Sequence, residues 1–314
     1  MRIAILGAGA MGSLIGYFLQ RGGAEISLVD PYEDHMNAIK DHGLELTING
    51  EMQTAKMQTF TAPEKVGVVD AVIVLVKCPV TEQAISSAKS LFGDKTYAIT
   101  LQNGVGNDDV LKNFFPAELI LKGVMKITCQ LTAPGKISSN ILGDLTAVQL
   151  GTVTGDAAAS ATATRIVDIL CKGGLTAEYQ EKIDDYIWGK AINNIAVNSS
   201  CAIVRCNIRS YCTHPEGRLL LERCLREVIK VAAAKNIILD FDKVIDSIEK
   251  HTIPKFGSHL PSTAQDVKAK QKTEIDFLNG AISRYGKELG IDTPVNDVIA
   301  AFIRIIQDNY ENQF

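Results

Sequence analysis

Residues 2–12 read RIAILGAGAMG, a short apolar run that leads into three closely spaced glycines. The run Arg2–Leu6 has the length and composition of a buried β-strand, and Ala10–Gln20 continues with apolar residues at helical spacing. Further strand-like and helical runs alternate behind them, at Glu25–Val29, Glu33–Lys40, Ala71–Val76 and Tyr97–Leu101. Because continuous apolar strands between helices are typical of a parallel sheet covered on both faces, we predict a doubly wound α/β fold.

The glycine cluster Gly7-Ala8-Gly9-Ala10-Met11-Gly12 has the spacing G-x-G-x-x-G between a strand and a helix. That context is typical of a Rossmann dinucleotide-binding turn. The first glycine permits the tight turn, the second lets the backbone approach a pyrophosphate, and the third lets the helix pack on the strand. We therefore predict cofactor contacts at Gly7, Gly9, Ala10, Met11 and Gly12; the alternative is a strand-to-helix turn without a ligand.

Two further residues bear on the cofactor. Asp30 ends the second predicted strand, where a carboxylate accepts hydrogen bonds from the ribose hydroxyls of NAD and repels the 2′-phosphate of NADP. We predict NAD, with NADP as the second candidate; alternatively, Asp30 only begins a turn with Pro31. Lys77 follows the run Ala71–Val76 at the carboxyl edge of the sheet, where ligands bind in this fold. It is either a cofactor contact or an exposed lysine at a strand end.

The pattern changes along the second half of the chain. Leu119–Gly151 carries short alternating runs broken at Pro134-Gly135 and Gly143-Asp144, which predict antiparallel strands that close the first domain. An alanine-rich helix is predicted at 156–170. From about residue 181 onward helical spacing dominates, in Tyr186–Asn198, Arg218–Lys235, Asp242–His251, Val267–Leu289 and Asn296–Asn309. We predict a dinucleotide-binding Rossmann domain over 1–180 and an all-helical substrate and catalytic domain over 181–314.

Composition narrows the possible partners. The 314 residues carry a formal net charge of −4, which argues against a general nucleic-acid surface. No apolar run reaches the roughly 18 residues of a membrane helix, so no membrane contact is expected. The seven cysteines include no C-x-x-C pair, and we predict reduced thiols without a metal site. These features indicate a cytoplasmic protein.

A polar stripe interrupts one of the apolar helices. Lys190, Asn194 and Asn198 are four residues apart, which puts them on one helix face among apolar neighbours. The stripe indicates either a face directed into a cleft or a solvated surface.

Together with the motifs above, further matching segments make the sequence resemble the ketopantoate reductase (2-dehydropantoate 2-reductase) family over nearly its whole length. The resemblance rests on four blocks in order: Gly7–Gly12, Leu101–Gly106, Trp188–Asn198 and Pro261–Asp276. It implies a Rossmann domain followed by a helical domain, and hydride transfer from NAD(P)H to the keto carbon of a small 2-oxo acid, giving a D-2-hydroxy acid.

The resemblance also assigns roles within the stripe. Lys190 is expected to be the general acid that protonates the developing alkoxide. Asn194 and Asn198 are expected to hydrogen-bond the oxygens of the substrate. Glu274 is expected to keep the lysine charged; alternatively, it is a first-turn glutamate that favours a helix N-terminus.

Two more residues receive roles in the same way. Ser262 matches the family serine that binds the substrate carboxylate, and its alternative is a helix N-cap after Pro261. Asn103 matches the family asparagine that lies at the nicotinamide and contacts substrate and cofactor; its alternative is a plain Asn-Gly turn residue.

One departure from the family pattern leaves a second type of enzyme as an alternative. The family often has a basic residue after the second strand, whereas this chain has Asp30-Pro31-Tyr32-Glu33. That segment resembles NAD-dependent D-2-hydroxyacid dehydrogenases of the D-mandelate type. A branched or aromatic 2-hydroxy acid is therefore the alternative substrate, and a non-catalytic dinucleotide-binding regulator is a third reading. A homodimer is expected from the family alone.

Overall fold

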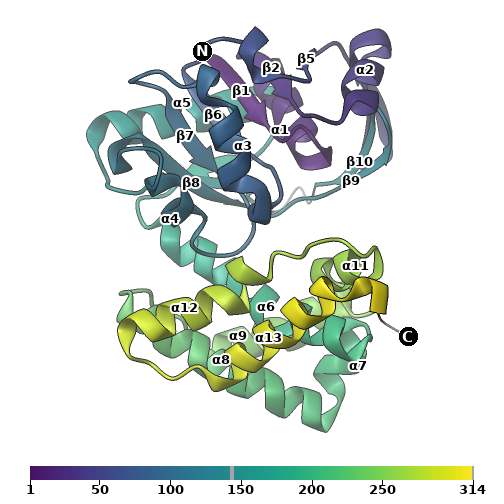
Figure 1. The fold of residues 1–314 in the computed structure, drawn as a ribbon, viewed down its shortest axis with the longest axis vertical. Helices are drawn as coiled ribbons and strands as arrows, with labels where there is room; N and C mark the ends of the chain where they lie inside the picture. The colour runs from purple at the N-terminus through teal and green to yellow at the C-terminus, as the bar shows by residue number, and fades with distance from the viewer. Residues whose placement is uncertain (142–144, 313–314) are drawn as a thin grey trace. The chain divides into compact units, whose positions relative to one another are not determined.

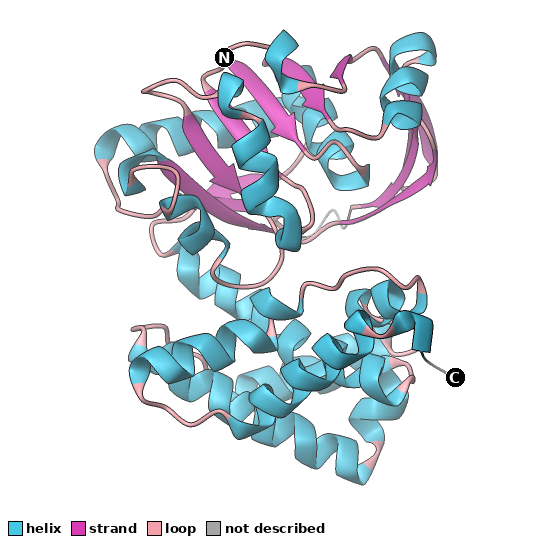
Figure 2. Ribbon diagram, in the orientation of Figure 1, coloured by secondary structure: helices cyan, strands magenta, loops and turns pink. Residues whose placement is uncertain are grey.

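The computed structural model describes residues 1–141 and 145–312, so the predicted break at Gly143-Asp144 lies outside the described residues. The chain forms two compact units. One contains Met1–Gln102 and Asn107–Ile183, and the other contains Asn103–Gly106 and Asp184–Phe314. Figure 2 shows that strands belong to the first unit and helices dominate the second. The dinucleotide-binding role of residues 1–180 and the substrate-binding and catalytic role of residues 181–314 stay predictions.

An eight-stranded sheet organises the first unit (Figure 1), in the order β12-β11-β8-β7-β6-β1-β2-β5. The strands are β1 (Arg2–Leu6), β2 (Glu25–Val29), β5 (Gln58–Phe60), β6 (Ala71–Val74), β7 (Tyr97–Thr100), β8 (Ile120–Met125), β11 (Val148–Thr152) and β12 (Ala177–Tyr179). From β1 the chain extends the sheet first through β2 to one side and later through β6 to the other. The order therefore reverses beside the end of β1, which is where such folds bind ligands.

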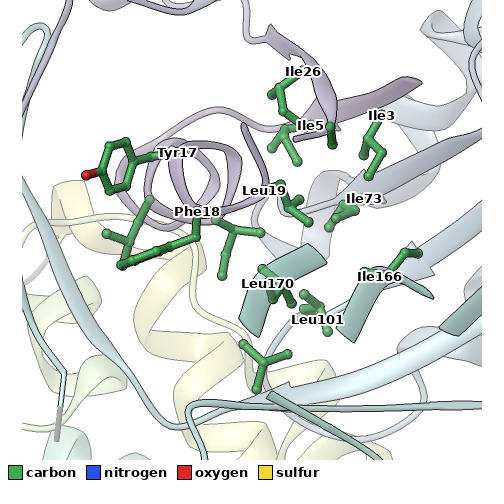
Figure 3. Packing of buried hydrophobic residues seen from close by; sticks show 14 of the residues in the cluster. Ile3, Ile5, Tyr17, Phe18, Leu19, Ile26, Ile73, Leu101, Ile166 and Leu170 are labelled. Atoms are coloured by element: carbon green, nitrogen blue, oxygen red, sulfur yellow. The ribbon is translucent and has the colours of Figure 1, made fainter. Parts of the chain in front are cut away.

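Both faces of this sheet are covered, as the apolar strands predicted. Ile3, Ile5 and Ile73 pack against α1 (Ala10–Arg21) and α5 (Ala157–Gly173), as Figure 3 shows for part of the cluster. Ala4 and Val72 point to the other face, covered by α3 (Thr81–Ser87) and α4 (Asn107–Lys112). Alternate residues of one strand thus enter two separate cores, which confirms the doubly wound fold.

A second, four-stranded sheet was not predicted. Its order is β4-β3-β10-β9, with β3 (Leu44–Ile48), β4 (Glu51–Ala55), β9 (Thr128–Ala133) and β10 (Lys136–Asn140). The expectation of purely antiparallel strands over Leu119–Gly151 is wrong in part. β9 pairs antiparallel with β10 and β8 with β11, but β8 is parallel to β7 and β10 is parallel to β3. The parallel partners are distant in sequence, so local alternation does not reveal them.

The second unit is built from helices. They are α6 (Ile183–Val204), α7 (Ile208–Thr213), α8 (Pro215–Ala234), α9 (Phe241–Ser247), α10 (Ile253–Phe256), α11 (Ser262–Lys268), α12 (Asn279–Leu289) and α13 (Pro294–Asp308). α2 (Glu33–His42) belongs to the first unit. Among the described residues, no helix has the length and apolar character needed to span a bilayer.

The single helix predicted over Val267–Leu289 is wrong. α11 ends at Lys268, a short 3-10 turn covers Ile275–Phe277, and α12 begins at Asn279. Lys270 has a left-handed backbone with φ of 54°, which ends the helix. Thr273 then binds Gln307 of α13 through its backbone N–H and its hydroxyl, at 3.1 and 2.8 Å. These tertiary hydrogen bonds hold residues 271–274 in an irregular, non-helical conformation despite the helical pattern of the sequence.

Candidate active site

The glycine turn, residues 7–12, has the geometry of a phosphate-binding turn. Gly7 has φ of 96°, and a Cβ there would lie 2.4 Å from the backbone nitrogen of Val76. A Cβ on Gly12 would lie 2.1 Å from the carbonyl oxygen of Gly7. A Cβ on Gly9, in contrast, would meet no described atom within 4 Å. Two glycines therefore permit packing, and Gly9 faces space that a ligand could occupy.

The N-terminus of α1 fits a bound diphosphate. Gly9 is the N-cap, no side chain of the described residues caps the helix, and its first turn contains no acid. The early N–H groups, of Ala10, Met11 and Gly12, belong to the helix end that attracts anions. When a dinucleotide is bound, these residues would hold its pyrophosphate.

Asp30 directly follows β2 and takes part in a local turn. Its Oδ1 accepts a hydrogen bond from the backbone N–H of Tyr32 at 2.9 Å. The local turn at Asp30 is therefore present in the structure. The second carboxylate oxygen could still accept a hydrogen bond from a ribose hydroxyl. Lys77 is exposed and precedes the 3-10 turn Cys78–Val80, beyond the end of β6.

A buried histidine that the sequence did not single out supports the glycine turn. His35 of α2 is fully buried, with Nε2 at 3.1 Å from the Ser13 hydroxyl, which donates to the carbonyl of Ala8 at 2.8 Å. Its Nδ1 accepts from the backbone N–H of Gly135 at 2.8 Å. These contacts require the neutral ring with its proton on Nε2. Burial lowers the pKa of His35, against the opposing effect of Asp30.

In the helical unit, Lys190 and Asn103 are joined directly. The Nζ of Lys190 on α6 donates a hydrogen bond to Oδ1 of Asn103 at 2.7 Å. The two residues are 87 positions apart, and Asn103 follows the last residue of β7 by three positions. Asn103 is therefore more than an Asn-Gly turn residue, and Lys190 is not simply a solvated lysine.

A backbone clamp links the Asn103 loop to the segment of Glu274. The N–H of Val105 donates to the carbonyl of Phe277 at 2.8 Å. Gly104 has φ of 89°, and a Cβ there would lie 2.1 Å from that same carbonyl oxygen. Glu274 immediately precedes the 3-10 turn that contains Phe277. The glycine after Asn103 thus permits the close approach that holds the two segments together.

Farther along α6, Asn198 and Ser262 form a second pair. Asn198 is buried, and its Nδ2 donates to the Ser262 hydroxyl at 3.3 Å. Ser262 is the first residue of α11, whereas Pro261 occupies the N-cap position without a side-chain hydrogen bond. The N-cap alternative for Ser262 is therefore wrong. Asn194 lies between Lys190 and Asn198 on the helix and is half-buried.

A buried asparagine that sequence reasoning missed, Asn279, links α6 to α13. Its fully buried Nδ2 donates to the carbonyl of Ile195 in α6 and to Oδ1 of Asn296 in α13, both at 3.0 Å. Asn296 in turn donates to Glu227 of α8 at 2.7 Å. Only the packing of four helices reveals this network, because no local motif surrounds Asn279.

The described residues contain no cluster of three or more His, Cys, Asp or Glu side chains placed to hold a metal ion. The Lys190 ammonium is hydrogen-bonded to the Asn103 amide, and the loop of Asn103 is linked through Val105 and Phe277 to the segment that carries Glu274. Such a group suits proton donation to a developing oxyanion.

Comparison with known proteins identifies relatives of this chain. The family model described as "Ketopantoate reductase PanE/ApbA" matches residues 3–154, and its C-terminal counterpart matches 182–307. The 2-dehydropantoate 2-reductase of Streptococcus pyogenes is 32% identical over 304 residues, covering 96% of this chain and 97% of that protein. The enzyme of that name from Lactococcus lactis is also 32% identical, over 310 residues, with the same coverage. A ternary structure of D-mandelate dehydrogenase with NADH and anilino(oxo)acetate is 33% identical, with a TM-score of 0.88 over 100% of both chains.

The Rossmann sheet with its glycine turn and the helical unit with its asparagine-bound lysine agree with these relatives, and the protein is an NAD(P)-dependent oxidoreductase. The chain belongs to the ketopantoate reductase family.

Proposed function

We propose that this protein reduces the keto group of a small 2-oxo acid to a D-2-hydroxy acid, with Lys190 as the general acid. The observation that carries the proposal is the 2.7 Å hydrogen bond from Lys190 to Asn103. It joins the cation of α6 to a residue three positions beyond a strand whose carboxyl end belongs to the ligand-binding edge. A reduced nicotinamide, when bound, supplies the hydride.

The residues of the chain divide the remaining work. As the keto oxygen gains charge, Lys190 would donate a proton to it from Nζ and stabilise the charge before transfer. Asn103 would orient the ammonium through its hydrogen bond to Nζ, and Nζ would turn an N–H group toward the substrate oxygen as the substrate binds. Glu274, on the segment clamped to the Asn103 loop, would favour the charged lysine.

The substrate carboxylate is assigned to the other end of the stripe. Asn198 and Ser262 already share a hydrogen bond, and both have further donor capacity for a carboxylate. Asn194, between them and Lys190, would bind the middle of a short substrate. From Lys190 to Asn198 the helix rises about 12 Å, so the side chains of the stripe and Ser262 would have to converge on a 2-oxo acid, whose keto and carboxylate groups are on neighbouring carbons.

For the cofactor we propose NAD, held by the glycine turn at the pyrophosphate, by Asp30 at the ribose and by Lys77 at the strand edge. The carboxylate of Asp30 supports this choice because it would repel a 2′-phosphate. The similarity to a D-mandelate dehydrogenase solved with NADH favours the same choice and supports the second candidate function, reduction of an aromatic or branched 2-oxo acid.

A substrate panel tests both functions. The purified protein is assayed with ketopantoate, a branched aliphatic 2-oxo acid and phenylglyoxylate, each with NADH and with NADPH, by loss of nicotinamide absorbance. Turnover of ketopantoate above the others supports the first function, and turnover of phenylglyoxylate supports the second. Binding of a dinucleotide without turnover of any 2-oxo acid would contradict both and favour the regulator.

We infer that the protein is a homodimer. Exposed apolar side chains at Val298, Phe302 and Ile305 of α13, which are 54, 50 and 59% exposed, support this oligomeric state. Light scattering coupled to a sizing column at several protein concentrations tests the oligomeric state.

We also infer a cytoplasmic location, supported by seven cysteines that are all present as free thiols. Cell fractionation with an antibody against the chain tests that inference.

A further inference from the structure

The C-terminal end of α6 brings two cysteines together. The backbone N–H of Cys206 donates to the carbonyl of Cys201 at 3.2 Å, and Arg205 between them has φ of 55°. A six-to-one hydrogen bond around a left-handed residue is the Schellman motif, which commonly ends helices. In this motif the side chains of the two hydrogen-bonded positions pack against each other. Here both of those positions are cysteines.

The backbone geometry suits a covalent link between them. Disulfides bridge α-carbons that are about 4.4–6.8 Å apart. The backbone hydrogen bond between Cys201 and Cys206 keeps the two α-carbons close, and the motif turns both side chains to the same side.

The two thiols differ in access and are in contact. Cys201 is fully buried, whereas Cys206 is half-buried and borders solvent. Burial raises the pKa of both thiols; the nearby Cys206 thiol raises the pKa of Cys201 further, whereas the Cys201 thiol offsets part of the rise for Cys206. Cys206 is therefore the thiol that ionises first and that a solvent reagent reaches.

We propose that Cys201 and Cys206 form a reversible oxidation site that closes to a disulfide in the presence of hydrogen peroxide. The Cys206 thiolate attacks a peroxide oxygen, so an S–O bond forms, the O–O bond breaks and hydroxide leaves to become water. The Cys201 sulfur then attacks the Cys206 sulfur, the S–O bond breaks, and a second water carries away the Cys201 proton. The peroxide is reduced by two electrons and the thiol pair is oxidised by two; a dithiol reductant reverses the change.

The site lies beside the proposed substrate-binding pair but does not depend on the proposed function. Asn198 precedes Cys201 by three residues on α6 and holds Ser262. A third thiol, Cys212 of α7, has its pKa raised to about 11, mainly by burial, with a smaller contribution from Cys206. Cys212 is thus the neighbour that competes for either partner.

The sequence makes the pairing easy to read by mass spectrometry. Trypsin cleaves after Arg205, so Cys201 falls in peptide 191–205, Cys206 in peptide 206–209 and Cys212 in peptide 210–218. The reduced full-length protein is treated with hydrogen peroxide, its remaining thiols are alkylated, and it is denatured and digested without reductant. We expect peptide 191–205 joined to 206–209, two hydrogens lighter than their sum, and its loss after dithiothreitol.

Two variants control the experiment. Cys206→Ser removes the accessible thiol at a half-buried position, and we expect no joined peptide and a reduced Cys201. Cys171→Ser removes the exposed thiol of α5 and is expected to leave the joined peptide unchanged. The proposal is overturned if wild-type protein yields no joined peptide, or if peptide 210–218 is the partner of either cysteine instead.

Discussion

The glycine turn would bind the dinucleotide, and the α6 stripe (Lys190, Asn194 and Asn198) would bind the substrate. The two regions are built in different ways. In the turn, the groups offered to a ligand are backbone N–H groups, and glycines at fixed spacing create the space for them. In the helical unit, the polar contacts join side chains that are 87 and 64 positions apart. A backbone site is therefore encoded locally, whereas a side-chain site depends on how distant segments pack.

The largest expected effect falls on the side-chain site. Lys190→Ala removes the proposed proton donor, and we expect kcat to fall about 10²–10⁴-fold, which is the usual contribution of a general acid. Steady-state kinetics on the best 2-oxo acid of the panel measure it. Lys182→Ala is the matched control, because Lys182 is an exposed lysine that immediately precedes α6. A Lys190→Ala enzyme as fast as the control would remove the basis of the mechanism.

Within the glycine turn, two identical substitutions should separate packing from binding. Gly12→Ala places a Cβ 2.1 Å from the carbonyl oxygen of Gly7, so we expect the free energy of unfolding to fall by about 1–3 kcal/mol. Gly9→Ala meets no described atom within 4 Å and should leave stability unchanged while raising the KM for the dinucleotide. Urea unfolding and cofactor titration give the two numbers. Equal destabilisation by both variants would contradict this division.

The acid after β2 should have a smaller effect, on cofactor choice. Asp30→Asn removes the charge but keeps an oxygen that accepts the hydrogen bond from Tyr32. Asp30 is half-buried, and loss of its repulsion toward the 2′-phosphate is worth about 1 kcal/mol, so the preference for NADH over NADPH should fall roughly fivefold. Asp30→Ala, which also removes the turn contact, shows whether local structure contributes. A preference that Asp30→Asn leaves unaltered would mean that other residues select the cofactor.

The smallest effect concerns His35 and pH. Burial lowers the pKa of His35 below its ordinary value of 6.5, so the unfolded chain takes up a proton first as the pH falls. The stability that depends on the neutral ring is complete above that value and decreases below it, by at most about 0.8 kcal/mol between pH 7.5 and 6. Urea unfolding at both pH values measures this loss.

His42→Gln is the control for that experiment, because His42 is an exposed histidine at the end of the same helix. His35→Gln should lose the pH dependence and His42→Gln should keep it. The same pH dependence in both variants would show that the His35 contacts with Ser13 and Gly135 do not set it.

The same contrast explains what the sequence could predict. The apolar runs and glycine spacing predicted the doubly wound sheet and the glycine turn, because both depend on local pattern. The break at 269–278 and the second sheet were missed, since Thr273 binds Gln307 and β10 pairs with β3 across long separations. For the site, helical spacing predicted the stripe, and the family resemblance supplied Asn103, Ser262 and Glu274. Neither could reveal Asn279 or His35, whose partners are set by tertiary packing alone.

The most direct test of the central claim is the pH dependence of kcat in the wild type and in Lys190→Arg. A general acid works in its protonated form, so wild-type kcat should decline at alkaline pH as the lysine loses its proton. Arginine stays charged across that range, so the variant should be slower and lack the alkaline decline. An alkaline decline of the same midpoint and slope in both enzymes would contradict the assignment of the proton donor to Lys190.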